Sequence, residues 1–394
     1  MAAALLLHRD GHRVTVFERF DAATPIGSGL MLQPTGLAVL SALGLDGQAM
    51  RSGARIDRLF GQAGAAGRTV LDVRYSALRR EGLFGVGIHR AALFDILHGA
   101  LIQAGIEVVT GHEAVRSEPH AGGRRSLTFA NGRAAGPFDL VVDALGTRTP
   151  LASSTGRALA YGALWASLDW VDGTGLDPAA LSQRYRAAST MIGIMPSGRV
   201  GQHSNAQSPK TQATFFWSLR ADRLADWRAR GLDDWKADAL GLWPALRPYL
   251  DQIADADKLT FAQYAHRTLA APAESGLIHI GDAWHSTSPQ LGQGANMALL
   301  DAWALSLALR EHGDIADALT AAVRLRRNHV RLYQAMSLLL TPVYQSDSRL
   351  APFLRDWAMG PLSRLWPLGA IQAAMVSGLV GSPLSTLDLA GPRR

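Results

Sequence analysis

The sequence predicts an α/β protein with a mostly parallel sheet, a separate antiparallel sheet and a helical C-terminal part. Two observations support this. Over the first 154 residues, short apolar runs bounded by glycines alternate with helical patterns, as in βαβ units. Longer strands with alternating polarity then follow. We expect a discontinuous first domain (1–154 and 268–345), a second domain (155–267) whose sheet is joined by 56–75, and a helical tail (346–394).

Composition indicates a globular protein that uses a cofactor for any redox chemistry. The 394 residues are 48% hydrophobic, enough for one large core or two coupled ones. There are no cysteines, which excludes disulfides, thiolate metal sites and cysteine-based redox chemistry and fits a reducing cytoplasm. No His, Asp or Glu spacing typical of a metal site is seen either.

The net charge of +6 does not indicate a nucleic-acid-binding protein. The basic residues are scattered, and the tightest cluster, Arg324 to Arg331, alternates with apolar residues on a predicted helix. Nor do the apolar runs predict stable membrane insertion. Ala2 to Leu7 lacks the basic flank of a signal peptide, and Leu365 to Val380 is too short to span a bilayer, which leaves peripheral contact as the alternative.

The first elements are typical of a Rossmann-like, dinucleotide-binding unit. A helix, Ala2 to Arg9, precedes a strand, Arg13 to Arg19, that ends in an acid. In such folds an acid about 20 residues beyond the G-x-G-x-x-G motif binds the ribose hydroxyls, and Glu18, beside Arg19, suits that role. The motif and the first strand would therefore precede residue 1. We expect either a start codon assigned too late or a true truncation.

The next segment contains further glycine-rich and basic candidates for ligand binding. A turn, Gly27 to Gly36, leads into a short helix ending near Leu45, and a strand, Leu83 to Ile88, leads into a helix that starts near Arg90. Arginine at such a place can bind phosphate oxygens through its planar guanidinium. Three more strands are expected, at Ile106–Thr110, Leu127–Ala130 and Phe138–Ala144.

Residues 281–301 form the most informative stretch, a strand end, a loop and a glycine-punctuated helix start. Asp282 follows a short buried strand, Leu277 to Ile280, and so emerges where open α/β sheets bind ligands. Its carboxylate can hold a sugar or ribityl hydroxyl. The helix opened by Gly292, Gln293 and Gly294 directs unpaired N–H groups and its positive dipole end at an anionic ligand. His285 is interpreted as structural.

This stretch resembles the second flavin-binding motif of the FAD-dependent aromatic hydroxylases, the class A flavoprotein monooxygenases that include p-hydroxybenzoate and salicylate hydroxylases. Its residues match the pattern G-D-A-x-H-x-x-x-P-x-x-G-Q-G-x-N, with Trp284 at a position that is usually small. In the segment that follows Glu18, Thr35 stands where Asn is common. The resemblance implies FAD contacts at Glu18, Arg19, Gly29, Gln33, Arg90, Asp282, Pro289, Gly292, Gln293, Gly294 and Asn296, with Asp301 completing the motif.

One departure concerns nicotinamide handling. Leu145 stands where the family usually has an Asp associated with the FAD pyrophosphate and with the reduced nicotinamide cofactor. Asp143 lies two residues away and, on an ideal strand, points to the same side. Whether Asp143 substitutes for the missing acid is left open by the sequence.

The second domain resembles the antiparallel sheet that covers the flavin ring in this family. Strands are expected at Leu159–Asp169, Met191–Met195, Val200–Ser204 and Thr211–Leu219, and helices at 221–230 and 233–246. Phe215 and Trp217 fall on one face of the last strand and Phe216 on the other. Phe215, Trp217 and Pro289 are the candidate substrate contacts, with a core role as the competing interpretation of the two aromatic residues.

The resemblance implies a monooxygenase. NAD(P)H reduces FAD, dioxygen gives a flavin hydroperoxide, and a hydroxyl group is transferred to a small, electron-rich, aromatic substrate. Because the cofactor performs this chemistry, no catalytic side chain is assigned. The alternatives are a same-fold flavin reductase or halogenase, disfavoured because the Trp-x-Trp-x-Ile-Pro motif is missing, and a non-catalytic remnant that acts as a binding protein. Substrate identity, NADH or NADPH use and oligomeric state are left open.

Overall fold

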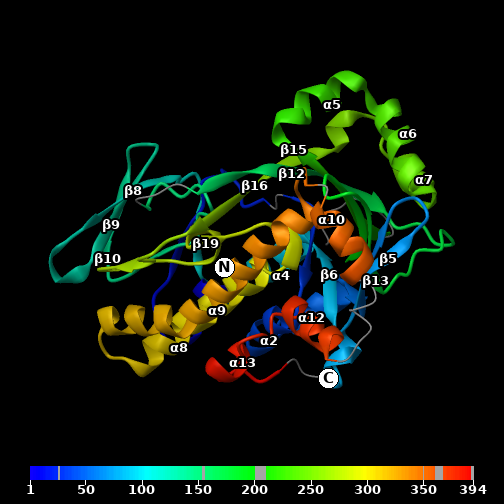
Figure 1. Ribbon diagram of the computed structural model, residues 1–394. Helices are drawn as coiled ribbons and strands as arrows, with labels where there is room; N and C mark the ends of the chain where they lie inside the picture. The colour runs from blue at the N-terminus through cyan, green and yellow to red at the C-terminus, as the bar shows by residue number, and fades with distance from the viewer. Residues whose placement is uncertain (25–26, 153–155, 200–209, 349, 360–366, 392–394) are drawn as a thin grey trace.

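The structure of the protein, a computed structural model, describes residues 1–24, 27–152, 156–199, 210–348, 350–359 and 367–391 (Figure 1). Its largest sheet has eight described strands, and all neighbours in it are antiparallel except β13 and β4. In spatial order they are β19 (His285–Ser286), β16 (Thr260–Thr268), β12 (Arg157–Asp169), β15 (Thr211–Arg220), β14 (Thr190–Arg199), β13 (Ala180–Arg186), β4 (Arg58–Ala63) and β5 (Arg68–Arg74).

Smaller sheets make up the rest of the β structure. β1 (Thr15–Phe17) pairs in parallel with β7 (Glu107–Val109), and β11 (Val141–Asp143) pairs in parallel with β18 (Leu277–His279), whose other neighbour is β17 (Ala273–Glu274). The remaining sheets are β10 (Ala134–Phe138), β9 (Arg125–Phe129) and β8 (Ala114–Pro119), and β2 (Gly29–Leu32), β6 (Gly85–His89) and β3 (Ala54–Ile56).

The helices fall into three groups along the chain. The first group is α1 (Ala2–Arg9), α2 (Pro34–Ala42), α3 (Asp46–Ser52) and α4 (Arg90–Gln103). The second is α5 (Leu224–Arg230), α6 (Leu232–Leu242) and α7 (Arg247–Leu250). The third is α8 (Gly294–Glu311), α9 (Ile315–Tyr344), α10 (Leu350–Leu354), α12 (Leu368–Val376) and α13 (Pro383–Thr386). No described helix combines the length and apolarity needed to cross a bilayer.

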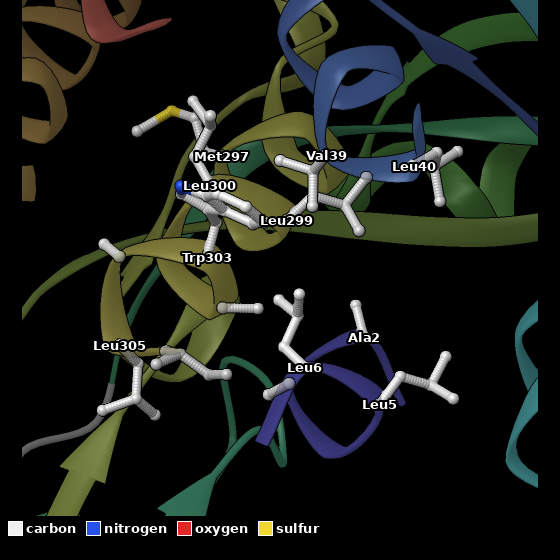
Figure 2. Close-up of a cluster of buried hydrophobic side chains, with 14 of the residues drawn as sticks. Ala2, Leu5, Leu6, Val39, Leu40, Met297, Leu299, Leu300, Trp303 and Leu305 are labelled. Atoms are coloured by element: carbon white, nitrogen blue, oxygen red, sulfur yellow. The ribbon is translucent and has the colours of Figure 1, made fainter. Parts of the chain in front are cut away.

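The larger hydrophobic core lies among α1, α2, α4, α8 and α9. Figure 2 shows Leu6 of α1 facing the side chains of α8, with Val39 of α2 on the other side of the same cluster. Leu6, Val39 and Leu300 are fully buried. Burial of each such side chain contributes about 1.5–3 kcal/mol, so this core fixes the start of α8, which carries the glycine-punctuated motif.

A second core lies between the eight-stranded sheet and the layer formed by α5, α6 and α7, which Figure 1 shows covering one face of the sheet. Side chains that alternate along β15 point to opposite faces, so Phe215 and Trp217 enter this core and Phe216 does not. On the opposite face, Phe216, Tyr185 and Met191 form a smaller buried cluster with Tyr344 of α9, and these residues also line a cavity.

Most predicted elements are present, with shifted ends: β1 and β7 are shorter than expected, whereas β12, β14 and β15 are longer. The helix expected at 233–246 ends at Leu242, because Pro244 cannot continue it. Residues 58–74 form β4 and β5, which extend the large sheet beyond the 155–267 segment. The strand expected at Val200–Ser204 lies outside the described residues.

Candidate functional site

One continuous cavity of about 2350 Å³ connects the small parallel sheets to the large antiparallel sheet. At one end it is lined by β1 and the turn after β11, and at the other by the free face of the eight-stranded sheet. The loop 281–294 lies between the two ends. A ligand with a nucleotide at one end and a flat reactive group at the other matches this shape.

Asp282 stands on the wall of this cavity. It belongs to the turn after β18, and a Cβ built at Gly294 would lie 4.0 Å from its Oδ1, so the carboxylate is beside the start of α8. The side chain is exposed to the cavity yet surrounded by protein. This burial raises the pKa of Asp282 above 3.8, opposed by the charges of His285 and Arg90.

The start of α8 is arranged to receive an anionic or polar group. Gly292 has φ +61°, in the left-handed region that favours glycine, and it turns the chain into the helix. Among the described residues no side chain caps α8, whose N-cap is Gln293. Gly294 and Ala295 line the cavity, so the uncapped N–H end of the helix is directed at the ligand.

Gln33 and Asn296 hold the walls of the site. Asn296 Oδ1 accepts from the Gln33 backbone N–H at 2.8 Å, and its Nδ2 donates to Met31 O and Gly292 O, both at 3.1 Å. Asn296 is fully buried and is not among the cavity-lining residues, so its side chain positions β2 and the loop instead of facing the cofactor space. Gln33 does line the cavity and accepts a hydrogen bond from Tyr75.

The side chain of Gln293 points to the C-terminal helices. Its Nε2 donates to the backbone carbonyl of Val376 at the end of α12, and the residue is only 3% exposed. Gln293 lines the cavity as well. We therefore assign its side chain to attachment of α12, which leaves its backbone for the ligand.

Arg90 and Gly29, both predicted ligand contacts, line the cavity. Arg90 begins α4, is exposed on the cavity wall, and donates its backbone N–H to Ser28 O at 3.1 Å. A Cβ at Gly29 would lie 2.0 Å from Thr214 Oγ1, so only glycine allows β2 to approach the large sheet this closely. The neighbouring His89 joins the same two parts through Nε2 and Ser167 Oγ, 2.8 Å apart.

At the other end of the cavity, Glu18 and Arg19 follow β1. Both line the cavity, and Glu18 Oε1 accepts from the Phe20 N–H at 3.1 Å. The exposed Arg19 guanidinium lies over the Phe20 ring, 4.5 Å from its centroid. The predicted residues of this end are therefore brought to the same cavity as Asp282.

Asp143 lines the cavity, but its carboxylate is not free. It is 1% exposed, and its carboxylate accepts from Thr149 Oγ1 at 2.6 Å and from the Leu145 N–H at 2.9 Å, with His279 Nδ1 at 2.6 Å. Leu145 is 47% exposed on the cavity wall. Asp143 thus stabilises the turn that carries Leu145, and it is poorly placed to replace an acid at that position.

A buried ionic network lies behind the motif. Asp301 Oδ2 accepts from the Gly281 N–H at 2.9 Å and lies 2.6 Å from His285 Nε2, and its Oδ1 accepts from Arg326 Nε at 2.8 Å. Burial alone would raise the pKa of Asp301, but the charges and hydrogen bonds of His285 and Arg326 lower it to about 2. His285 is therefore structural, as predicted, and the network fixes the turn that carries Asp282.

The proposed substrate contacts are only partly brought to the cavity. Pro289 lines it, whereas Phe215 and Trp217 lie in the core under α5–α7, where both ring systems pack edge-on against Trp235. The interpretation of these two residues as substrate contacts does not match their position. Phe216 faces the cavity instead, because successive side chains of a strand alternate.

Several cavity residues were missed from the sequence. Trp165, Gln183, Tyr185, Met191 and Tyr264 line the cavity from four different strands. Alternation along each strand gives two candidate faces, but only the position of the α5–α7 layer decides which of them is covered. The set of sheet residues that line the cavity therefore depended on tertiary packing.

Comparison with known proteins gives the family. A family model described as an FAD binding domain matches residues 1–331. A probable 2-heptyl-3-hydroxy-4(1H)-quinolone synthase of Rhodococcus erythropolis is 24% identical over 99% of this chain and 93% of its own length. The 3-amino-4-hydroxybenzoate 2-monooxygenase of Streptomyces cremeus is 27% identical over 76% of this chain and 73% of its own.

Solved structures share the fold. HpxO of Klebsiella pneumoniae, solved with FAD and uric acid, aligns with a TM-score of 0.78 and 19% identity over 96% of this chain and 94% of its own. The tetrameric form of 2-methyl-3-hydroxypyridine-5-carboxylic acid oxygenase aligns with a TM-score of 0.76 and 21% identity over 98% and 94%.

The cavity, the carboxylate beside an uncapped helix and the extent of the family match agree with one another. Asp282, Gly292 and Gly294 form a cradle in which the glycines leave room for a ligand backed by N–H groups, which suits the ribityl chain and ring of a flavin. The chain belongs to the FAD-binding-domain family of class A flavoprotein monooxygenases, and it is an FAD-dependent oxidoreductase.

Proposed function

We propose that the protein hydroxylates a small aromatic molecule, with NAD(P)H as reductant and dioxygen as oxidant, in the part of the cavity bounded by the large sheet. The observation that carries this proposal is the continuity of the cavity. It joins the FAD cradle at Asp282 and Gly294 to the free sheet face that bears Trp165 and Phe216.

The chain's own residues would bind and orient the cofactor. Asp282 holds ribityl hydroxyls, the start of α8 supplies N–H groups to the polar edge of the flavin ring, and Arg90 supplies positive charge along the route to Glu18. When bound, FAD supplies the redox chemistry, accepting hydride from NAD(P)H and activating dioxygen. The protein has to position the ring and keep water away from it.

The relatives support an aromatic substrate. Their names include quinolone synthases, an aminohydroxybenzoate monooxygenase and FAD-dependent urate hydroxylases, and the rings in those names carry oxygen or nitrogen substituents. Trp165 and Phe216, with ring centroids 5.0 Å apart, offer this chain a flat apolar wall for such a ring.

The test is substrate-dependent NAD(P)H oxidation by the FAD-loaded protein. NADH and NADPH should each be tried with a panel of phenols, hydroxyquinolines and aromatic acids, while oxygen uptake and hydroxylated product are measured. We expect at least one aromatic compound to accelerate oxidation and to gain one hydroxyl group. A flavin-loaded protein that neither nicotinamide reduces, with or without any of these compounds, would favour the non-catalytic alternative.

A further inference from the structure

We propose that the substrate is an uncharged aromatic molecule with a hydrogen-bonding substituent, and that carboxylate-bearing aromatics are excluded. This inference rests on the proposed function and concerns the end of the cavity against the large sheet. We call that end the aromatic chamber and define it by Trp165, Gln183, Tyr185, Met191, Phe216, Tyr264, Leu340 and Tyr344, all of which line the cavity.

Strand register places the chamber residues of the sheet on one face. Trp165 of β12 is directly opposite Phe216 of β15, Phe216 is opposite Gly193 of β14, and Gly193 is opposite Gln183 of β13. Residues paired across neighbouring strands share a face, so these side chains form one row. Met191 and Tyr185 are also paired. Each is two residues from Gly193 or Gln183 on the same strand, so both side chains lie on the same face.

Glycines let the aromatic rings lie over the sheet. A Cβ at Gly193 would lie 1.9 Å from the ring of Phe216, and a Cβ at Gly61 would lie 2.7 Å from the ring of Tyr185. Both rings therefore occupy space that a side chain would fill. Tyr344 of α9 packs against Tyr185, with ring centroids 5.5 Å apart, and brings a third ring to the chamber.

The chamber has no charged group among its described residues. The arginines and the lysine that line the same cavity are not among these eight residues: Arg13, Arg19, Arg90, Arg148 and Lys258. Lys258 lies just before β16, two residues from Thr260, which pairs with Trp165, and its amine already donates to Gln252 O at 2.8 Å. His89, engaged with Ser167, has its pKa lowered by burial and by the charge of Arg90, so it is neutral near pH 7.

One guanidinium lies close behind the chamber, but it is already bonded. Arg355 stands over the Tyr185 ring, 4.6 Å from its centroid. Its Nε donates to Asp356 at 2.8 Å, and its other nitrogens donate to Val343 O at 3.2 Å and Ala187 O at 3.0 Å. A carboxylate entering the chamber would lose its hydration and, among the described residues, meet only cations that already have hydrogen-bond partners, which is costly in an apolar site.

Amide groups supply the polar recognition. Gln183 Oε1 accepts from Tyr185 Oη at 2.7 Å, and its Nε2 has only the weak acceptor Met191 Sδ, at 3.7 Å. Gln290 Nε2 and Gln372 Oε1 are buried without a partner among the described residues, and both residues line the cavity. Neutral donors and acceptors of this kind suit a ring that carries a carbonyl, hydroxyl or ring N–H.

The experiment compares matched ligand pairs on the FAD-loaded protein. Hydroxyquinoline and its carboxylic acid derivative, and naphthol and hydroxynaphthoate, are titrated by calorimetry, with the flavin absorption spectrum as a second readout. We expect each neutral member to bind at least about tenfold more tightly than its carboxylate. Equal or tighter binding of the carboxylates, or no binding by any member, would overturn the inference.

A charge-insertion variant tests the location. Gln183→Arg should tighten carboxylate binding at least about tenfold and weaken neutral binding, whereas Gln263→Arg, at an exposed position outside the cavity lining, should leave both unchanged. Unaltered carboxylate affinity in a Gln183→Arg protein that retains FAD would also count against the chamber. The flavin spectrum of the unsubstituted protein tests the proposed function separately. If that protein binds no FAD, the proposed function itself is refuted.

Discussion

At the scale of single residues, Asp282 combines an energetic cost with the binding role that we propose for it. Surrounding protein raises its pKa, so its charged form is less stable here than in water. A hydroxyl-bearing ligand that donates hydrogen bonds to the carboxylate offsets this cost. Because Asp282 lies beside the uncapped start of α8, one ligand can meet both the carboxylate and the free N–H groups of the helix.

We predict that Asp282→Ala weakens FAD binding about ten- to hundredfold, because each charge-assisted hydrogen bond contributes ~1.5–3 kcal/mol. Fluorescence titration with FAD measures the dissociation constant. Asp282→Asn keeps the shape of the side chain, so its FAD affinity should lie between those of the unsubstituted protein and of Asp282→Ala. A folded Asp282→Ala protein with unchanged FAD affinity would disprove the assignment.

Asp301 and Arg326 are both about 1% exposed and stabilise each other. Asp301→Asn leaves the guanidinium without its counter-charge, so we expect the free energy of unfolding to fall by about 3–5 kcal/mol. The double change Asp301→Leu with Arg326→Met removes both charges and should cost less. Denaturant unfolding of the unsubstituted protein and of these two variants checks this, and a larger loss in the double variant would contradict it.

His329 makes stability depend on pH. Burial, then the charge of Arg326, lowers the pKa of His329 from 6.5 to about 3. The unfolded chain thus takes up a proton below pH 6.5 that the folded protein takes up only near pH 3, so the free energy of unfolding falls as pH falls through this window. His329→Gln should flatten the slope of unfolding free energy against pH; an unchanged slope would rule out this residue as its source.

At the scale of elements, strand β14 leaves room for the Phe216 ring because Gly193 has no side chain. We predict that Gly193→Ala displaces the Phe216 ring, since the added Cβ would lie 1.9 Å from it. Aromatic ligand binding should fall by at least about tenfold while FAD remains bound. Gly99→Ala on α4, where nothing lies within 4 Å, is the matched control and should leave both affinities unchanged. Calorimetry on both variants measures this, and normal ligand affinity in Gly193→Ala would contradict it.

Helix α12 is attached to the body through its last turn. Tyr333 Oη donates to Met375 O at 2.9 Å, His329 Nε2 lies 3.1 Å from Gly378 O, and Gln293 donates to Val376 O. Because Gln372, Met375 and Val376 line the cavity, this attachment closes one side of the cofactor and substrate space.

At the scale of the whole molecule, one cavity reaches both cores, so a ligand that fills it should stabilise the entire chain. We predict that FAD at about a hundred times its dissociation constant raises the free energy of unfolding by ~2.7 kcal/mol. Thermal unfolding over a range of FAD concentrations measures this. In Asp282→Ala the same increase should require about ten- to hundredfold more FAD; coincident curves for the two proteins would refute the link.

The sequence by itself determined the motif and its neighbours. Asp282, Gly292 and Gly294 could be predicted because a carboxylate at a strand end and glycines at a helix start are local requirements. The same residues also predicted the family, the FAD-dependent aromatic hydroxylases. Local spacing also placed Arg90 at the first turn of α4. The interpretation of His285 as structural agrees with its bond to Asp301.

Only the tertiary structure decided which sheet face lines the cavity and which polar side chains hold its walls. Alternation along β15 puts Phe215 and Trp217 on one face and Phe216 on the other, but it does not say which face is covered. The α5–α7 layer covers the face of Phe215 and Trp217. Asn296 turned out to bond Gln33, which is 263 residues distant in sequence. Strand alternation fixes relative facing, but burial of a face depends on packing between segments that are far apart in the chain.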